Sequence, residues 1–216
     1  MINYSKKTNR LDISIDSNRK KIIVKQKWKY SWLNAPGTTT WTYSDKKDFH
    51  SKVDNLIWNS WGNFFFLKTT GTSNFSKKHK STRWDIDFDI EWVTNNEHWN
   101  VNVTKYPNNY IGNPTSSVRW NARIIKLDTK DTSTRKRVRN NTDYFQTPVV
   151  HEFGHSVGNS IFASPSMHGD EYKSSSNYYQ DKISLMNIGN KLRDRHLDYV
   201  ISELNTIIPN TNFKKY

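Results

Sequence analysis

Two histidines and a glutamate stand close together in the segment His151-Glu152-Phe153-Gly154-His155. On an α-helix, residues four apart are separated by about 40° around the axis and by about one turn along it, so both imidazoles can reach one cation. Glu152 projects beside them, where it can take a proton from a metal-bound water. With 7 histidines and 5 glutamates in 216 residues, chance produces a His-Glu-x-x-His segment in roughly 0.5 % of chains. The segment therefore predicts a catalytic metal site.

The residues around this segment also favour a site. The approach TPVVHEFGHSVG is apolar and then abruptly polar, so the polar groups would enter a partly buried helix, where metal coordination offsets the cost of burying them. Gly154 inside the helix costs about 1 kcal/mol relative to alanine, which suggests that another group approaches closely there. Gly158 is placed to end the helix in a left-handed conformation and to turn the chain back toward the metal.

The segment, together with residues further along the chain, resembles the metzincin clan of zinc metallopeptidases. The clan pattern HExxHxxGxx(H/D) has its third ligand three residues after the glycine, where this chain has Ile161, which cannot bind zinc. A metzincin-like subgroup instead runs HEFGHxxGxxDEY, followed by Ser-(Ile/Leu)-Met-Asn and Arg-x-Arg-His. The corresponding pieces occur here in the same order: Asp170-Glu171-Tyr172, Ser184-Leu185-Met186-Asn187 and Arg193-Asp194-Arg195-His196. The resemblance then implies a nine-residue insertion before the third ligand.

The resemblance implies one catalytic Zn²⁺ held by His151, His155 and Asp170. His168 is the alternative third ligand, because imidazole is an equally good zinc donor. Met186 is expected in a Met-turn that packs beneath the histidines as an apolar floor without coordinating the metal. The clan often has a tyrosine two residues later, where this chain has Ile188, so an oxyanion donor or a residue supporting the ligands is sought among five others: Glu171, Tyr172, Arg193, Arg195 and His196.

His196 and Glu171 can each have a structural role instead of a role in catalysis or metal binding. His196 lies on an apolar helical stripe with Leu192, Tyr199/Val200 and Leu204, and it can equally be a buried, hydrogen-bonded histidine. Glu171 is expected to make a salt bridge or to support a ligand, not to bind the metal. The other histidines, His50, His79 and His98, are expected on the surface or in loops, without a role.

Hydrophobic periodicity predicts an α+β fold. Alternating residues indicate strands at 21–30, 83–93, 99–106 and 118–127, with 83–93 pairing directly with 99–106. Apolar residues at helical spacing indicate a helix over 45–61 and further helices at 143–158 and 191–207, and 128–142 is expected to be a polar loop. Together with the resemblance, these elements predict a twisted mixed sheet with a backing helix, an active-site helix, and a C-terminal helix after the Met-turn. Residues 1–216 are expected to form one catalytic domain, with the sheet in about 1–142 and the site in about 143–216.

Composition restricts the function further. The chain lacks cysteine, which excludes thiolate zinc sites and cysteine nucleophiles. No apolar run is long enough for a membrane span, and the first ten residues lack the apolar region of a signal peptide. The 33 Lys and Arg against 20 Asp and Glu give a net charge of +13, which favours solubility and acidic partners. The lysines at 25, 27 and 29 alternate along a strand and should face solvent, and no nucleic-acid-binding motif accompanies the basic runs at 77–80 and 135–139.

The hypothesis from the sequence is a zinc-dependent endopeptidase with Glu152 as general base. By analogy with the clan, an extended protein or peptide substrate would pair with an edge strand within 118–127. Two alternatives remain: a non-catalytic, metal-stabilised module that binds anionic partners, and a basic nuclease-like toxin domain. Some proteins of the DEY type resemble cargo of bacterial injection systems and other toxins, so the resemblance also suggests a secreted effector exported without a signal peptide. The sequence does not identify the compartment.

Overall fold

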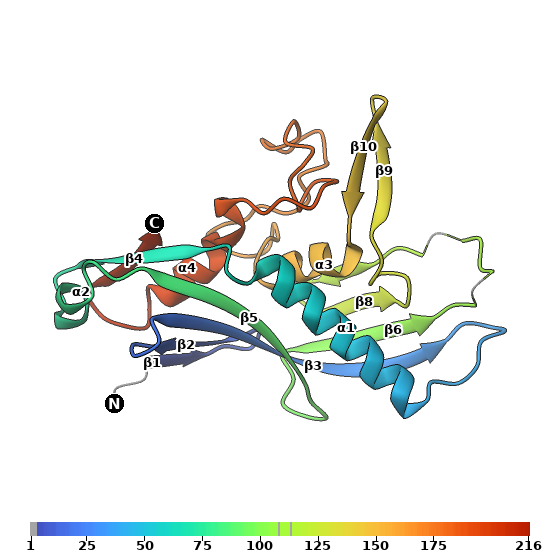
Figure 1. Cartoon of the computed structure of the whole chain (residues 1–216), viewed down its shortest axis with the longest axis horizontal. Helices are drawn as coiled ribbons and strands as arrows, with labels where there is room; N and C mark the ends of the chain where they lie inside the picture. Colours follow the sequence, from blue (N-terminus) through green and yellow to red (C-terminus); the bar gives the residue numbers. More distant parts are fainter. Residues whose placement is uncertain (1–3, 108, 113) are drawn as a thin grey trace.

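The computed structural model describes residues 4–107, 109–112 and 114–216, and its main feature is a mixed β-sheet (Figure 1). The strands follow the order β11-β4-β5-β3-β6-β8-β7, and β2 and β1 continue from the free edge of β3. The neighbours β5-β3-β6-β8 are parallel, whereas β7 and β4 run antiparallel to the strands next to them. The sheet strands are β1 (Tyr4–Lys7), β2 (Asp12–Asp16), β3 (Lys21–Asn34), β4 (Phe66–Gly71), β5 (Trp84–Trp92), β6 (Trp99–Lys105), β7 (Ser117–Arg119), β8 (Ile124–Asp128) and β11 (Thr211–Lys215).

The long strand β3 organises this sheet. Its first half pairs in parallel with β5, from Lys21 opposite Asp85 to Trp28 opposite Trp92, and its second half pairs in parallel with β6, beginning with Trp28 opposite Trp99. The predicted direct pairing of 83–93 with 99–106 is therefore wrong. Because β5 and β6 run in the same direction on opposite edges of β3, the short connection between them crosses over β3 and does not form a hairpin.

The helix α1 (Tyr43–Trp61) covers one face of the sheet, as predicted. It begins at a capping box in which the Thr42 and Asp45 side chains each accept a hydrogen bond from the other residue's backbone N–H, which satisfies two otherwise free donors. Its buried residues are spaced by about one helical turn: Phe49, Val53, Ile57 and Trp61. The Trp61 ring packs edge-on against Phe88 of β5 and Phe153 of the next long helix, so both helices lie on the same face of the sheet.

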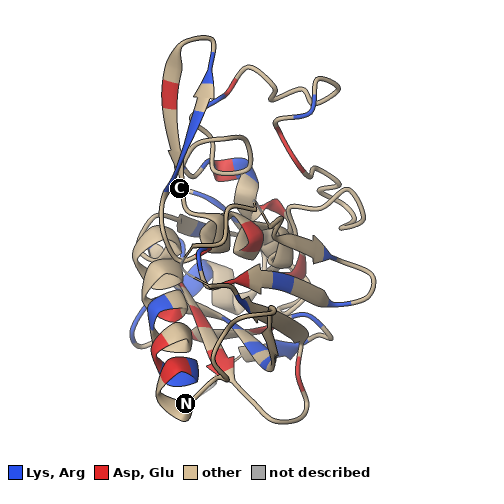
Figure 2. Ribbon diagram, turned by 90° about the vertical axis from the view of Figure 1, so that its right-hand side faces the viewer, with Lys and Arg blue, Asp and Glu red and all other residues tan. Residues whose placement is uncertain are grey.

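The opposite face of the sheet carries paired charges. Lys21 contacts Asp87, Lys25 lies 3.2 Å from Asp89, and Lys27 lies 3.0 Å from Asp12. The alternating burial of β3 confirms that its lysines leave the core on the polar face. Because acidic residues of neighbouring strands pair with them, these lysines are not a free basic surface. Lysine and arginine are spread over the sheet and also occur on a projecting hairpin (Figure 2).

The hairpin formed by β9 (Arg135–Arg139) and β10 (Thr142–Gln146) projects from the body of the molecule (Figure 1). It corrects two predictions, since 128–142 is not simply a polar loop and the helix at 143–158 does not begin at 143. Asn140 and Asn141 join the strands with φ values of 48° and 58°, and asparagine tolerates this left-handed conformation better than most residues. The predicted strand 118–127 is likewise two antiparallel strands, β7 and β8, joined by a turn at 120–123.

The C-terminal part carries the remaining helices. α3 (Pro148–Ser156) contains the two histidines, and α2 (Asn74–Lys78) is a short helix after β4. The predicted helix 191–207 is shorter, because a 3₁₀ turn (Asp194–Leu197) precedes α4 (Asp198–Leu204). The residues of the predicted apolar stripe are nevertheless all buried, although they do not share one helix: Leu192, His196, Tyr199, Val200 and Leu204.

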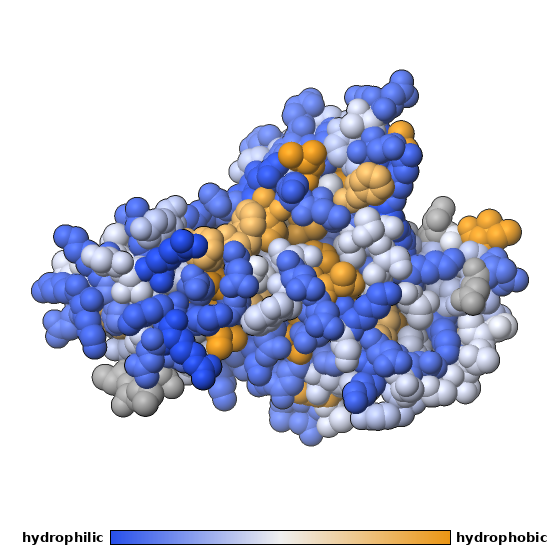
Figure 3. Space-filling view, viewed as in Figure 1, coloured by the Kyte–Doolittle hydropathy of each residue, from blue (hydrophilic) through white to orange (hydrophobic). Residues whose placement is uncertain are grey.

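Hydrophobic residues from 1–142 and from 143–216 join in one core. Hydrophilic residues cover most of the face shown in Figure 3, and hydrophobic residues show through in patches. Among the residues that the structure describes, no helix combines the length and the apolar character needed to cross a membrane.

Candidate metal centre

The two histidines of α3 bring their Nε2 atoms within 3.2 Å of each other. Pro148 occupies the start of the helix, where a missing N–H costs little. Val149, Val150 and Phe153 anchor the helix in the core. The one-turn spacing then leaves both imidazoles projecting from the same side of α3.

Each histidine is held by a carbonyl oxygen through its other ring nitrogen. His151 Nδ1 lies 2.7 Å from the oxygen of Leu185, and His155 Nδ1 lies 2.6 Å from the oxygen of Asn159. A carbonyl oxygen only accepts hydrogen bonds, so both Nδ1 atoms must carry the hydrogen. In the neutral rings, the two Nε2 atoms then present lone pairs to each other. This arrangement is suited to a cation between them.

Asp170 completes the group. Its Oδ1 lies 3.0 Å from His155 Nε2 and 3.8 Å from His151 Nε2, and the three donor atoms all lie within 4.8 Å of one another. Tetrahedral coordination at about 2.0–2.1 Å places neighbouring donors about 3.3–3.4 Å apart, so the three distances fit a single ion. Burial opposes ionisation of the Asp170 carboxyl, but its close contacts with the imidazoles of His151 and His155 outweigh burial and lower its pKa.

A loop brings Asp170 back to the helix. A Cβ added to Gly169 would lie 3.2 Å from Ile161 Cγ2 and 3.4 Å from the Ile161 backbone nitrogen. The chain therefore leaves at Ile161 and returns beside it at Gly169, which closes the loop that the sequence predicts as an insertion. This return places Asp170 beside the two histidines of α3.

His168 does not join the metal-binding group. Its Nε2 lies 2.9 Å from the Arg195 carbonyl oxygen, and its ring packs edge-on against Tyr178. Of the two third ligands considered from the sequence, the structure places Asp170 with the histidines and turns His168 toward the following segment.

The segment around Met186 lies beneath the histidines. Met186 is fully buried, and a Cβ added to Gly154 would lie 2.5 Å from its Sδ atom. The expected close approach at Gly154 is therefore confirmed. The preceding residue, Leu185, supplies the carbonyl oxygen that orients His151. At the helix end, Gly158 has φ +115° and abuts the Tyr199 side chain.

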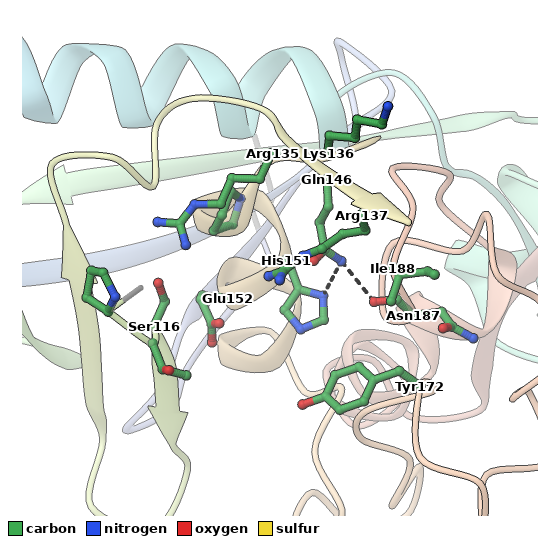
Figure 4. A pocket seen from close by; sticks show the side chains of 13 residues that line it. Ser116, Arg135, Lys136, Arg137, Gln146, His151, Glu152, Tyr172, Asn187 and Ile188 are labelled. Carbon is green, nitrogen blue, oxygen red and sulfur yellow. Dashed lines mark hydrogen bonds between the residues drawn. The ribbon is translucent and has the colours of Figure 1, made fainter. Parts of the chain in front are cut away.

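Gln146 supports the same region, although its sequence context gave no indication of a role. Its Nε2 donates hydrogen bonds to the carbonyl oxygens of Leu185, at 3.1 Å, and Asn187, at 2.9 Å. It thereby ties the end of β10 to the Met186 turn, and it lies against His151 (Figure 4). Only the approach of β10 to the turn, which is a tertiary feature, reveals this role.

Glu152 faces the cavity from the same helix. Its side chain is buried, and its Oε2 atom has no hydrogen-bond partner. Burial raises the pKa of Glu152 to about 7, with smaller contributions from neighbouring charges. A buried carboxylate oxygen without a partner is costly, and Glu152 lines the cavities on both sides of the histidines.

Glu171, Arg195 and His196 form a buried polar cluster away from the cavity. Arg195 binds both Glu171 oxygens at 2.7 and 2.8 Å, and it also binds Asp181. His196 Nε2 lies 3.4 Å from Glu171 and 3.2 Å from the Ser184 hydroxyl. Burial alone would raise the pKa of Glu171, but these contacts lower it to about 2.

The contacts of Arg193, Arg195 and His196 show whether these residues can serve as oxyanion donors. Arg193 is occupied by a bidentate pair with Asp181, and neither arginine lines the cavity at the histidines. The two arginines and His196 are therefore not placed as oxyanion donors. They hold the segment that follows Asp170.

Tyr172 is the one residue of the five that faces the site. It lines the cavities on both sides of the histidines, and its ring stacks at 6.5 Å from that of His151. Burial and the Asp170 carboxylate raise the pKa of Tyr172, so its hydroxyl retains the hydrogen that a donor needs.

The remaining histidines agree with their prediction in part, since His79 and His98 lie outside the helices and strands but not on the surface. His79 and His98 are buried, and His98 Nδ1 accepts a hydrogen bond from the Lys27 backbone. His79 packs against Phe75 and Trp84. The half-buried His50 contacts the Tyr30 hydroxyl. These three histidines are structural, because the aromatic core and the strand β3 enclose or contact them.

A cleft runs past the site beside the edge strand β7. One cavity of about 690 Å³ reaches from His151 and Glu152 toward the β9–β10 hairpin. A second, of about 330 Å³, lies on the side of His155 and Asp170 and is lined by Ser117 and Val118 of β7. Figure 4 shows His151 at the centre of the first, with Ser116 to one side and Asn187 and Ile188 to the other. The arrangement has the form of a metal-binding group with a carboxylate beside it, open to an extended ligand.

The sequence matches no protein-family model, and comparisons with curated proteins and with solved structures likewise find no match. The functional conclusions below therefore rest on the geometry of the site.

Proposed function

We propose that this chain is a zinc-dependent endopeptidase. The observation that carries the proposal is the convergence of two imidazole Nε2 atoms and one carboxylate oxygen, with both Nδ1 atoms committed to carbonyl oxygens. The unpartnered carboxylate oxygen of Glu152 next to this group supports catalysis over a purely structural site, because a structural site has no use for a base.

The donor set fits zinc better than the common hard cations. Two nitrogen donors and one oxygen donor are typical of catalytic zinc sites, in which a fourth position stays open, whereas Mg²⁺ and Ca²⁺ prefer oxygen donors only. His151, His155 and Asp170 would hold the ion. When bound there, zinc lowers the pKa of a coordinated water toward about 7 and polarises a carbonyl group. A similar triad also suits iron(II), but the adjacent Glu152 favours hydrolysis.

The protein's own groups would then position the substrate and move the proton. The Glu152 carboxylate takes a proton from the attacking water and returns it to the departing amine. The Tyr172 hydroxyl faces the same space and can donate a hydrogen bond to the oxygen on which negative charge develops. The strand β7 ends the sheet beside the cleft, so its free backbone groups can pair with an extended substrate.

The test compares Glu152→Gln with Glu91→Gln, which alters an exposed glutamate on the far side of the sheet. We expect both variants to bind about one zinc per chain by elemental analysis. Only Glu152→Gln should lose cleavage of casein and of a peptide library, by a factor of about 10²–10⁴. Cleavage by Glu152→Gln at the parent rate would contradict the mechanism.

The parent protein separates the alternatives. Bound zinc without cleavage of any peptide would favour the metal-stabilised binding module. Degradation of plasmid DNA with divalent ions, without peptide cleavage, would favour the nuclease-like domain. Iron in place of zinc would contradict the zinc assignment.

A further inference from the structure

The cleft is strongly basic on the side of the β9–β10 hairpin. The cavity of about 690 Å³ continues into another of about 440 Å³, and the two share five residues: Lys136, Arg137, Tyr172, Asn187 and Ile188. The second cavity adds Arg139 and Lys182 and is lined by no acidic residue. Glu152 is the only acidic residue lining the first. This side of the cleft, which we call the basic arm, therefore attracts negative charge.

Two of the cations that line the basic arm are ion-paired. Arg135 lies 2.7 Å from Asp131 and 3.4 Å from Asp128, and Lys136 lies 2.7 Å from Asp143. Their charges are largely compensated, which leaves them little capacity for a ligand.

Arg137 differs from its neighbours on β9. Its guanidinium makes no hydrogen bond or ion pair with any residue within 4–107, 109–112 and 114–216, and Arg137 lines both cavities of the basic arm. Its side chain lies near His151 and Gln146 in the view of Figure 4. A guanidinium offers a planar fork that binds a carboxylate through two hydrogen bonds. Arg137 thus offers an unpaired positive charge in the cavity that His151 and Glu152 also line.

The edge strand gives the cleft a direction. Pro114, Thr115 and Ser116 line the basic arm, whereas Thr115 to Val118 line the opposite cavity. Antiparallel ladders are slightly more stable per residue than parallel ones, so we take the substrate strand to pair antiparallel to β7, and it then runs from the Val118 end toward the Pro114 end. Its residues on the C-terminal side of the scissile bond would therefore enter the basic arm.

We infer that the cleft selects peptides with an aspartate or glutamate on the C-terminal side of the scissile bond, within two residues of it, and that Arg137 binds that carboxylate. The inference rests on the proposed peptidase function for the position of the scissile bond. It depends on the unpaired guanidinium and on the direction of β7, neither of which the metal group itself determines.

The test uses fluorogenic peptides that differ at one position and carry Glu, Gln or Lys at the first or second residue after the bond. We expect kcat/KM for the Glu peptide to exceed that for the Gln peptide by about 10-fold or more. Arg137→Gln should bring this ratio close to one, and Arg137→Glu should favour the Lys peptide. The matched control is Arg19→Gln, which alters an exposed arginine in the turn between β2 and β3 and should leave the ratio unchanged.

Binding provides a readout that does not require turnover. In the Glu152→Gln background, fluorescence anisotropy should show tighter binding of the Glu peptide than of the Gln peptide, and Arg137→Gln should abolish the difference. Equal binding of the two peptides, or a preference that survives Arg137→Gln, would overturn the inference while cleavage by the parent still supports the peptidase. A preference confined to the N-terminal side of the bond would overturn the assigned direction. The preference in binding without cleavage by the parent would support the basic arm and contradict the proposed function.

Discussion

At the scale of single residues, the imidazoles of His151 and His155 are oriented by the protein itself. The carbonyl oxygens of Leu185 and Asn159 fix the tautomer and the direction of each ring. Hydrogen bonds of this kind commonly hold metal-binding histidines and raise metal affinity. We therefore expect the two rings to need little reorganisation on binding an ion.

The third ligand can be tested by substitution. We expect Asp170→Ala to lower zinc affinity by at least 10- to 100-fold, because it removes the only carboxylate of the metal-binding group. His168→Ala should retain about one zinc per chain, since His168 faces the Arg195 carbonyl oxygen. Competition with a chromogenic chelator measures both. Loss of zinc from His168→Ala with retention in Asp170→Ala would reassign the ligand.

At the scale of elements, the Met186 turn and α3 depend on each other. Met186 fills the space that Gly154 leaves open, and Leu185 orients His151. Gln146 joins the end of β10 to the same turn. The site therefore lies where a helix, a hairpin and a turn meet. A change of packing at Gly154 should alter the positions of the two histidines.

Gly154→Ala tests this packing. The helix gains about 1 kcal/mol from alanine, but the added Cβ would lie 2.5 Å from Met186 Sδ and 3.2 Å from Trp61 Cζ2. We expect a net loss of about 1–3 kcal/mol in the free energy of unfolding, because overpacking outweighs propensity. Urea denaturation measures the change. The second substitution Met186→Ala should cost less in the Gly154→Ala background than alone, and strict additivity would contradict the contact.

Asp131 joins the elements on the other side of the cleft. Its buried carboxylate accepts hydrogen bonds from Ser116, which precedes β7, from the backbone N–H of Asp128, and from Arg135 of β9. Burial, followed by repulsion from Asp128, raises the pKa of Asp131 to about 6, although Ser116 and Arg135 oppose the rise.

The consequence for stability has a definite sign. A carboxyl whose pKa is raised by folding is protonated in both states below about pH 4, and between about pH 4 and 6 the folded state retains a proton that the unfolded chain loses. The free energy of unfolding should therefore fall over this range, by roughly 3 kcal/mol at most. In metal-free protein, Asp131→Asn should remove this part of the pH dependence, and the exposed control Asp143→Asn should retain it. An unchanged profile in Asp131→Asn would contradict the assignment.

At the scale of the whole molecule, the candidate metal group links α3 to the loop that contains Asp170, and no helix or strand pairing among the described residues joins these two parts. Between α3 and the 3₁₀ turn at 194–197, the described chain runs as turns and loops. This region is held by the Glu171–Arg195 cluster, by contacts of Asn187, and by Asp170 at the histidines. A bound ion would therefore stabilise the fold as well as the site.

Removal of the metal should lower the melting temperature. A ligand at about 1,000 times its dissociation constant stabilises the folded state by about 4 kcal/mol, which corresponds to roughly 8–16 °C for a chain of this size. Scanning calorimetry with zinc and with a chelator measures the shift. In Asp170→Ala, the melting temperature should differ little between zinc and chelator. A shift of equal size in Asp170→Ala would place the stabilising ion elsewhere.

The sequence by itself predicted the local features. The spacing of His151 and His155 and the helix 45–61 both follow from the 3.6-residue period, which depends only on neighbouring residues. The burial of the apolar residues within 192–204 was also predicted, although these residues do not share one helix. Gly154 correctly indicated a close approach because a glycine inside a helix has a local cost. The zinc, the peptidase activity and the export route stay predictions.

Only the tertiary structure decided which distant groups meet. The choice between Asp170 and His168 depends on how the loop closes at Gly169, and the roles of Gln146 and Arg137 depend on where the β9–β10 hairpin lies. The predicted direct pairing of 83–93 with 99–106 was wrong, because alternation identifies a strand but not its partner. Contacts between residues far apart in the chain are set by packing of the whole core, and no local pattern in the sequence records them.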